Sequence, residues 1–120
     1  MLYVEDNPAN LKLMETLIDR MEGITMLSAH TGELGLELAE ARKPDVIILD
    51  INLPGIDGFQ ALHRLKESET TRDIPVIALT ANAMPSEVER GLDAGFHRYL
   101  TKPIRIHEVT AARESALKAS

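Results

Sequence analysis

Short apolar runs alternate along the chain with segments of helical period. The apolar runs predict strands at residues 2–4, 24–29, 45–50, 74–80 and 97–101. Between and after them, apolar residues recur three or four positions apart, which predicts five amphipathic helices. The expected inward positions of these helices are Leu11, Met14, Leu17, Ile18 and Met21; Leu34, Leu38 and Ala41; Phe59, Leu62 and Leu65; Val88 and Leu92; and Ile106, Val109, Ala112 and Ala116.

Residues that start and stop helices stand at the edges of these segments. Asn7, followed by proline, and Thr31 and Asp57 have side chains that accept hydrogen bonds from a helix N-terminus. Gly23 and Gly95 are expected to close the first and fourth helices, because glycine adopts the backbone conformation that ends a helix.

Strands that alternate with helices favour right-handed βαβ crossovers. The run at 45–50 is apolar on both faces, as in a strand covered by helices on each side. We therefore expect an α/β fold, a doubly wound five-stranded parallel sheet of flavodoxin-like order 2-1-3-4-5 with five helices. The length of 120 residues fits one domain, over 1–120. Its first strand begins almost at residue 1, which suggests a domain cut from a longer protein, with a short natural N-terminus as the alternative.

Composition narrows the classes of partner. The net charge is −6 and the 13 basic residues are scattered, which argues against direct nucleic-acid binding by this domain. There is no long apolar run, so no membrane insertion is expected. The chain has no cysteine, which fits a cytoplasmic location.

Polar side chains end or follow four of the five apolar runs. Glu5 and Asp6 follow the first run, Asp50 ends the third, Thr80 ends the fourth and Lys102 follows the fifth. Ligands bind beyond the carboxyl ends of parallel strands, so these groups should share one edge of the sheet.

Three carboxylates at one edge repel each other, and one lysine offsets only part of that charge. Two unit charges about 4 Å apart cost about 4 kcal/mol at an effective dielectric near 20. Mg²⁺ prefers oxygen ligands and is commonly held by carboxylates together with a substrate phosphate. An aspartate beside a metal ion and a lysine can attack phosphorus, which makes Asp50 a candidate phosphoacceptor. Lys102 and the Thr80 hydroxyl would then contact the phosphoryl oxygens.

The ordered segments VEDNPAN, VIILDINLPGIDGF, IPVIALTANAM and YLTKP together resemble the receiver domain of bacterial two-component response regulators. The resemblance covers essentially the whole chain. It implies that Asp50 is the phosphoacceptor, and that Asp6, Asp50 and the backbone carbonyl of Asn52 bind Mg²⁺. Glu5 stands where many members have aspartate, and the resemblance implies that it helps to bind the ion, often through water.

The same resemblance implies a switch and a set of partners. Thr80 and Tyr99 match the family's switch pair, Lys102 matches its phosphate-binding lysine, and the bond from Lys102 to Pro103 is typically cis. The expected donor is a phosphohistidine on a histidine kinase or phosphotransfer domain, and the expected receiver of the signal is an output domain or protein. LTANAM and NPAN also resemble receivers attached to hybrid sensor histidine kinases. Such a domain assists its own phosphorylation and dephosphorylation but acts mainly as a switch.

Two other classes remain as alternatives. A phosphatase or phosphotransferase with an aspartyl-phosphate intermediate commonly carries a second acid two residues after the nucleophile, where this chain has Asn52. A flavodoxin-like cofactor binder needs a phosphate loop rich in Ser, Thr and Gly after the first strand, where Glu5 and Asp6 would repel a phosphate. Hydrolysis of assorted phosphate esters would support the first class, and a bound flavin the second.

Overall fold

The computed structural model describes residues 1–82 and 84–119, so Ala83 of the LTANAM segment lies outside the described residues. The strands are β1 (Leu2–Val4), β2 (Leu27–Ala29), β3 (Ile47–Asp50), β4 (Val76–Thr80) and β5 (Arg98–Thr101). The helices are α1 (Pro8–Asp19), α2 (Gly32–Arg42), α3 (Gly58–Glu67), α4 (Pro85–Ala94) and α5 (Ile106–Ala119).

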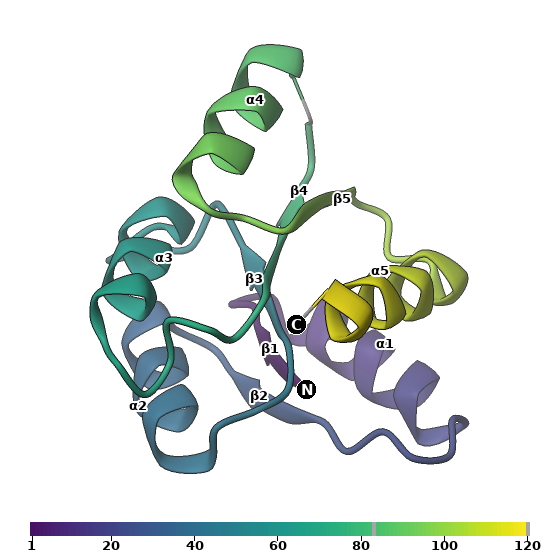
Figure 1. Cartoon of the computed structure of the whole chain (residues 1–120). Coiled ribbons are helices and arrows are strands. Elements are labelled where there is room, and N and C mark those ends of the chain that lie inside the picture. Colours follow the sequence, from purple (N-terminus) through teal and green to yellow (C-terminus); the bar gives the residue numbers. More distant parts are fainter. Residues whose placement is uncertain (83, 120) are drawn as a thin grey trace.

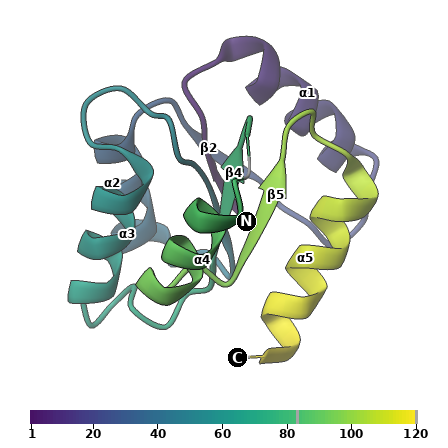
Figure 2. The same cartoon turned by 90° about the horizontal axis from the view of Figure 1, so that it is seen from above.

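All strand pairs are parallel, and the order across the sheet is β2-β1-β3-β4-β5. Helices α1 and α5 cover one face, and α2 and α3 cover the other, with α4 beside them toward β4 and β5 (Figure 1). The view from above shows α5 crossing beside α1 and the helices α2, α3 and α4 on the opposite side (Figure 2). The predicted α/β class, strand order and helix number are confirmed.

Alternation along the strands gives each face its own core. In β3, Ile47 and Leu49 point into the layer under α2 and α3, whereas Ile48 points into the layer under α1 and α5. All three are at most 1% exposed. A strand that is buried on both faces reads as continuous apolar sequence, which explains the run at 45–50.

Several elements are shorter than their apolar runs. The second strand covers Leu27–Ala29 rather than 24–29, because the three residues of β1 offer no more pairing positions. The first helix ends at Asp19, so Met21 lies in the following turn and donates its N–H to the Ile18 carbonyl. The predicted N-caps Asn7, Thr31 and Asp57 are confirmed by side-chain hydrogen bonds to their helices.

Two predicted inward positions are wrong. In α2, Ala41 is exposed, and the buried positions are Gly35 and its neighbours Gly32 and Ala39. A Cβ on Gly35 would stand 2.8 Å from a Val4 methyl, so the helix lies too close to β1 for a larger residue there. Hydrophobicity alone does not reveal such close packing.

In α4, Leu92 is 47% exposed, and Gly91 is the buried residue instead. The Tyr99 ring from β5 occupies the space beside Gly91, which turns the leucine outward. Val88 is half-buried, as the helical period indicates.

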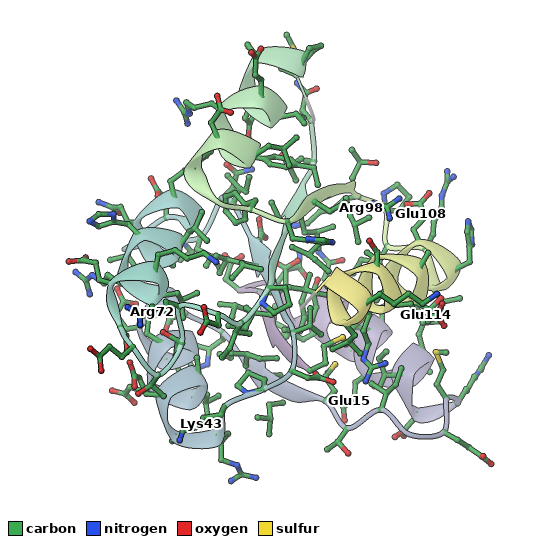
Figure 3. All side chains as sticks on the ribbon, in the orientation of Figure 1. Glu15, Lys43, Arg72, Arg98, Glu108 and Glu114 are labelled. Carbon is green, nitrogen blue, oxygen red and sulfur yellow. The ribbon has the colours of Figure 1, made fainter. Side chains whose placement is uncertain are left out.

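Charged side chains lie around the outside of the layers. Figure 3 shows Lys43 and Arg72 on the side of α2 and α3, and Arg98 and Glu108 near β5 and α5. Among the helices of the described residues, none combines the length and apolar character that crossing a membrane requires.

Candidate functional site

Backbone hydrogen bonds join the carboxyl ends of three neighbouring strands, β3, β4 and β5, at one edge of the sheet. The N–H of Ile51 donates to the Leu79 carbonyl, which joins the end of β3 to β4. The N–H of Lys102 donates to the Thr80 carbonyl at 2.8 Å, which joins β4 to the segment after β5. The polar residues that follow these strands therefore have fixed positions.

Lys102 bridges the two buried carboxylates of this edge. Its Nζ lies 2.9 Å from Asp50 Oδ2 and 3.0 Å from Glu5 Oε1. Glu5 is 0% exposed and Asp50 is 2% exposed, so water contributes little to the solvation of either charge. The ammonium comes from the opposite end of the sequence and is the main countercharge in direct contact with both acids.

Glu5 and Asp50 respond to this arrangement in opposite directions. Burial and the neighbouring Asp50 raise the pKa of Glu5, although Lys102 and Asn10 oppose the rise. Burial alone would raise the pKa of Asp50, but Glu5, the Lys102 ammonium and the Asn52 N–H hold it below its ordinary value. In the absence of a metal ion, the arrangement therefore disfavours the charge on Glu5 and favours the charge on Asp50.

Burial would also lower the pKa of Lys102, but its hydrogen bonds to Asp50 and Glu5 reverse this and raise the pKa. The lysine is thus held as a cation. An obligatory positive charge beside an ionised carboxylate suits a site that receives a group with negative oxygens.

Asp6 completes a group of carboxylates. One carboxylate oxygen each from Glu5, Asp6 and Asp50 lies within 4.8 Å of the others. Asp6 is exposed, whereas the other two are buried, so the group opens to solvent on one side. The Glu5 Oε2 atom is buried and has no hydrogen-bond partner within residues 1–82 and 84–119. Oxygen ligands with an unsatisfied buried atom fit a hard divalent cation.

The loop after β3 is held by a hydrogen bond to Asp50, the last residue of the strand. The N–H of Asn52 donates to Asp50 Oδ1 at 2.9 Å, so the Asn52 backbone is adjacent to the carboxylate. A Cβ on Gly58, which begins α3, would stand 2.7 Å from the Ile51 Cα, so the helix packs directly on this loop. The loop and its acid are therefore positioned together.

The two residues of the expected switch pair, Thr80 and Tyr99, form hydrogen bonds with backbone groups rather than with the carboxylates. The buried Thr80 hydroxyl accepts from the N–H of Asn82 at 3.3 Å, within its own loop. The Tyr99 hydroxyl donates to the Glu87 carbonyl of α4 at 3.3 Å. Its half-buried ring packs edge-on against Phe96, with centroids 5.6 Å apart.

Three contributors were missed by sequence reasoning. Tyr3 and Asn10 both donate to Glu5, and Gly91 provides the space for Tyr99. Tyr3 carries a recognisable signal, because it lies two residues before Glu5 in an otherwise apolar strand and so shares its face. Asn10 and Gly91 carry no such signal, because their contacts depend on how two elements pack.

The model of the family described as the response regulator receiver domain matches residues 1–114. This chain belongs to that family. The receiver domain therefore acts as a phosphoacceptor in two-component signal transduction. The cis peptide bond between Lys102 and Pro103 agrees with the expectation from the resemblance.

Relatives of the receiver domain are found in separate regulators and in kinases. The polar-differentiation response regulator DivK of Brucella ovis is 40% identical over 105 residues, which cover 88% of this chain and 85% of that protein. The sensor histidine kinase GacS of Pseudomonas protegens is 39% identical over 106 residues. These cover 86% of this chain but 12% of the kinase, so the chain spans about an eighth of that relative's length.

Solved structures match the receiver domain across nearly its whole length. The receiver domain of sensor histidine kinase PA1611 from Pseudomonas aeruginosa PAO1 has a TM-score of 0.87 at 33% identity, covering 98% of this chain and 95% of that one. That structure has a magnesium ion coordinated in its active-site cleft. A response regulator from Chloroflexus aurantiacus J-10-fl has a TM-score of 0.89 at 30% identity, covering 98% of this chain and 95% of that one.

Removal of the bridging ammonium of the receiver domain gives a direct test of the electrostatics. We expect Lys102→Met, without divalent ions, to lower the free energy of unfolding by about 2 kcal/mol at neutral pH, because two buried carboxylates lose their countercharge. Without Lys102 the pKa of Glu5 rises further. A raised folded-state pKa stabilises the protein increasingly as pH falls, so the penalty should be smaller at about pH 5.

Urea unfolding of both proteins at the two pH values measures this difference. Lys12→Met is the matched control, because Lys12 is exposed on α1, and it should change stability by less than about 0.5 kcal/mol. A Lys102→Met penalty that is equal at both pH values, or absent, would contradict the proposed charge balance.

Proposed function

We propose that Asp50 accepts the phosphoryl group, with Mg²⁺ held by Asp6, Asp50 and the backbone carbonyl of Asn52, and with Glu5 assisting. The observation that carries the proposal is the Lys102 bridge, which keeps Asp50 ionised and fixed at the sheet edge. Asp50 is the acid that both the lysine and a backbone N–H orient, which distinguishes it from its neighbours.

The residues present fit a magnesium ion. The three carboxylates offer oxygen atoms within 4.8 Å of one another, and the Glu5 Oε2 atom is buried without a hydrogen-bond partner among the described residues. The ion would supply positive charge for the developing charge on the phosphoryl oxygens. The magnesium in the PA1611 receiver supports this assignment by analogy.

The transfer step uses the ionised Asp50 carboxylate as nucleophile. One carboxylate oxygen forms a bond to phosphorus while the phosphorus–nitrogen bond of a phosphohistidine breaks, and the electron pair leaves with the imidazole nitrogen. Lys102 then exchanges part of its contact with the carboxylate for a phosphoryl oxygen. Positioning and charge account for most of the catalysis of such a transfer.

Phosphorylation would change which positions of the Thr80 and Tyr99 side chains are favoured. It adds about two negative charges and new acceptor oxygens at Asp50. The Thr80 hydroxyl, bonded to its own loop in this structure, would turn to donate to the phosphoryl group. Tyr99 would leave its place against α4 and occupy the space vacated near Thr80. The surface of α4, β5 and α5 then differs between two states whose populations the phosphoryl group shifts.

We further propose the partners implied by this chemistry. The donor is a phosphohistidine of a histidine kinase or phosphotransfer domain, and an output domain or protein reads the switched surface. The similarity to GacS and to the PA1611 receiver supports a place within a hybrid kinase, and the similarity to DivK supports a separate regulator. Residues 1–120 act as one receiver domain in the cytoplasm in either arrangement.

Replacing the nucleophile tests the central residue. Asp50→Asn is expected to abolish hydroxylamine-labile phosphate uptake from acetyl phosphate with Mg²⁺, because an amide cannot form the acyl phosphate. Intact-protein mass spectrometry measures the addition. Asp57→Asn is the matched control, because this exposed acid caps α3 and should leave uptake intact. Uptake by Asp50→Asn at the wild-type level would refute the assignment.

The position of the Tyr99 ring beside Gly91 gives a second test. A Cβ on Gly91 would stand 1.9 Å from the Tyr99 hydroxyl and 2.4 Å from its ring, so Gly91→Ala must displace the tyrosine. Alanine favours the helix itself by about 1 kcal/mol, so α4 is not weakened by propensity. We expect the Tyr99 ring resonances of unphosphorylated Gly91→Ala to move toward those of the phosphorylated wild type.

A paired variant separates the tyrosine from other effects of this change. In a Tyr99→Ala background, Gly91→Ala should have little further effect on the spectrum, since no ring remains to be displaced. Unchanged Tyr99 resonances in Gly91→Ala, or movement away from the phosphorylated positions, would count against this role.

A further inference from the structure

Three donors converge on one oxygen of Glu5. The Tyr3 hydroxyl donates to Oε1 at 3.1 Å, the Asn10 side-chain amide donates at 3.0 Å, and the Lys102 ammonium lies 3.0 Å away. The other oxygen, Oε2, is buried and accepts no hydrogen bond from any residue that the structure describes. One oxygen of the carboxylate therefore has three donors, and the other oxygen has none among the described residues.

The unpartnered Oε2 atom destabilises the fold unless a ligand binds to it. A buried polar atom without a partner costs about 1–3 kcal/mol relative to a satisfied one. Glu5 is 0% exposed, so solvent cannot satisfy Oε2, and the nearby carboxylates of Asp6 and Asp50 are acceptors like itself when ionised. A cation among these oxygens is the partner that the arrangement lacks.

The two neutral donors come from rigid elements. Tyr3 lies in β1, is 0% exposed, and shares a strand face with Glu5. Asn10 lies in the first turn of α1, a helix fixed by its Asn7 cap. Each hydroxyl or amide thus approaches Glu5 from a backbone that has little freedom to move.

A glutamate needs such support more than an aspartate does. Its side chain has one more rotatable bond, and ordering a long side chain costs conformational entropy. Mg²⁺ demands nearly ideal octahedral geometry, so a loosely held ligand serves it poorly. Groups that hydrogen-bond a metal ligand typically change metal affinity about 10–100-fold when they are removed.

We propose that Tyr3 and Asn10 are positioning residues, which hold Oε1 of Glu5 so that Oε2 faces the metal ion. The inference rests on the proposed function, since it requires that the acids bind Mg²⁺. Tyr3 and Asn10 contact Glu5 and act through it. Together they allow a glutamate to serve at a position where its extra length would otherwise leave the carboxylate unordered.

The test measures divalent-ion affinity by calorimetry on the unphosphorylated domain. Tyr3→Phe removes only the hydroxyl, and Asn10→Ala removes only the amide. Each is expected to weaken Mg²⁺ binding by about 10-fold. Ca²⁺ tolerates irregular geometry, so its affinity should fall less, and the preference for Mg²⁺ over Ca²⁺ should decrease. A general loss of structure would weaken both ions alike.

Two controls test whether the change in Mg²⁺ affinity is transmitted through Glu5. Thr16→Val removes an exposed hydroxyl of α1 that donates to the Lys12 carbonyl, and it should leave both affinities unchanged. In a Glu5→Ala background, Tyr3→Phe should have no further effect on Mg²⁺ affinity, because the side-chain oxygens through which it acts are gone. Urea unfolding without metal confirms that each variant is folded at the temperature of the titration.

The outcomes separate this inference from the proposed function. If wild type binds Mg²⁺ and Asp50→Asn blocks phosphate uptake, but Tyr3→Phe and Asn10→Ala keep wild-type affinity and selectivity, the positioning role alone is overturned. An equal loss for Mg²⁺ and Ca²⁺, or a loss that persists with Glu5→Ala, also overturns it. If the wild type does not bind Mg²⁺ at millimolar concentration, the metal assignment itself fails and this inference with it.

Discussion

The structure of the sheet edge depends on one buried contact, in which the Lys102 ammonium bridges the carboxylates of Glu5 and Asp50. Without it, two nearly unexposed acids would face each other with no cation between them. The lysine supplies one positive charge against two carboxylates, and burial together with the neighbouring Asp50 raises the pKa of Glu5. The fold therefore holds a deficit of positive charge at the place where a divalent ion and a phosphoryl group are expected to meet.

The parallel sheet makes this contact possible because it brings distant segments to one edge. Glu5 follows β1, Asp50 ends β3 and Lys102 follows β5, yet their polar atoms lie within 3.0 Å across the bridge. On the side toward α4, Thr80 bonds within its own loop and Tyr99 bonds to a backbone carbonyl of α4 instead. The same edge thus combines a rigid, charged centre with two side chains held by weaker and exchangeable contacts, as a switch requires.

Much of this could be predicted from sequence, and the failures have physical causes. The doubly wound sheet follows from alternating apolar runs, and the meeting of Glu5, Asp50 and Lys102 follows from strand ends sharing an edge. The exposed Leu92 and the buried Gly91 could not be predicted, because they depend on how closely the Tyr99 ring packs on α4. Asn10 was missed for the same kind of reason, since its contact with Glu5 depends on where α1 lies beside β1.

The account is tested most directly by the pH dependence of Mg²⁺ binding to the unphosphorylated domain. The raised pKa of Glu5 means that protons compete with the ion for this carboxylate at a higher pH than they would at an ordinary glutamate. Affinity should therefore fall as pH falls through that pKa, and calorimetry at that pH in buffers of different ionisation enthalpy should detect proton release. Glu5→Gln should remove the release. Binding without proton release, or binding that strengthens as pH falls, would contradict the claim that a cation completes this group of acids.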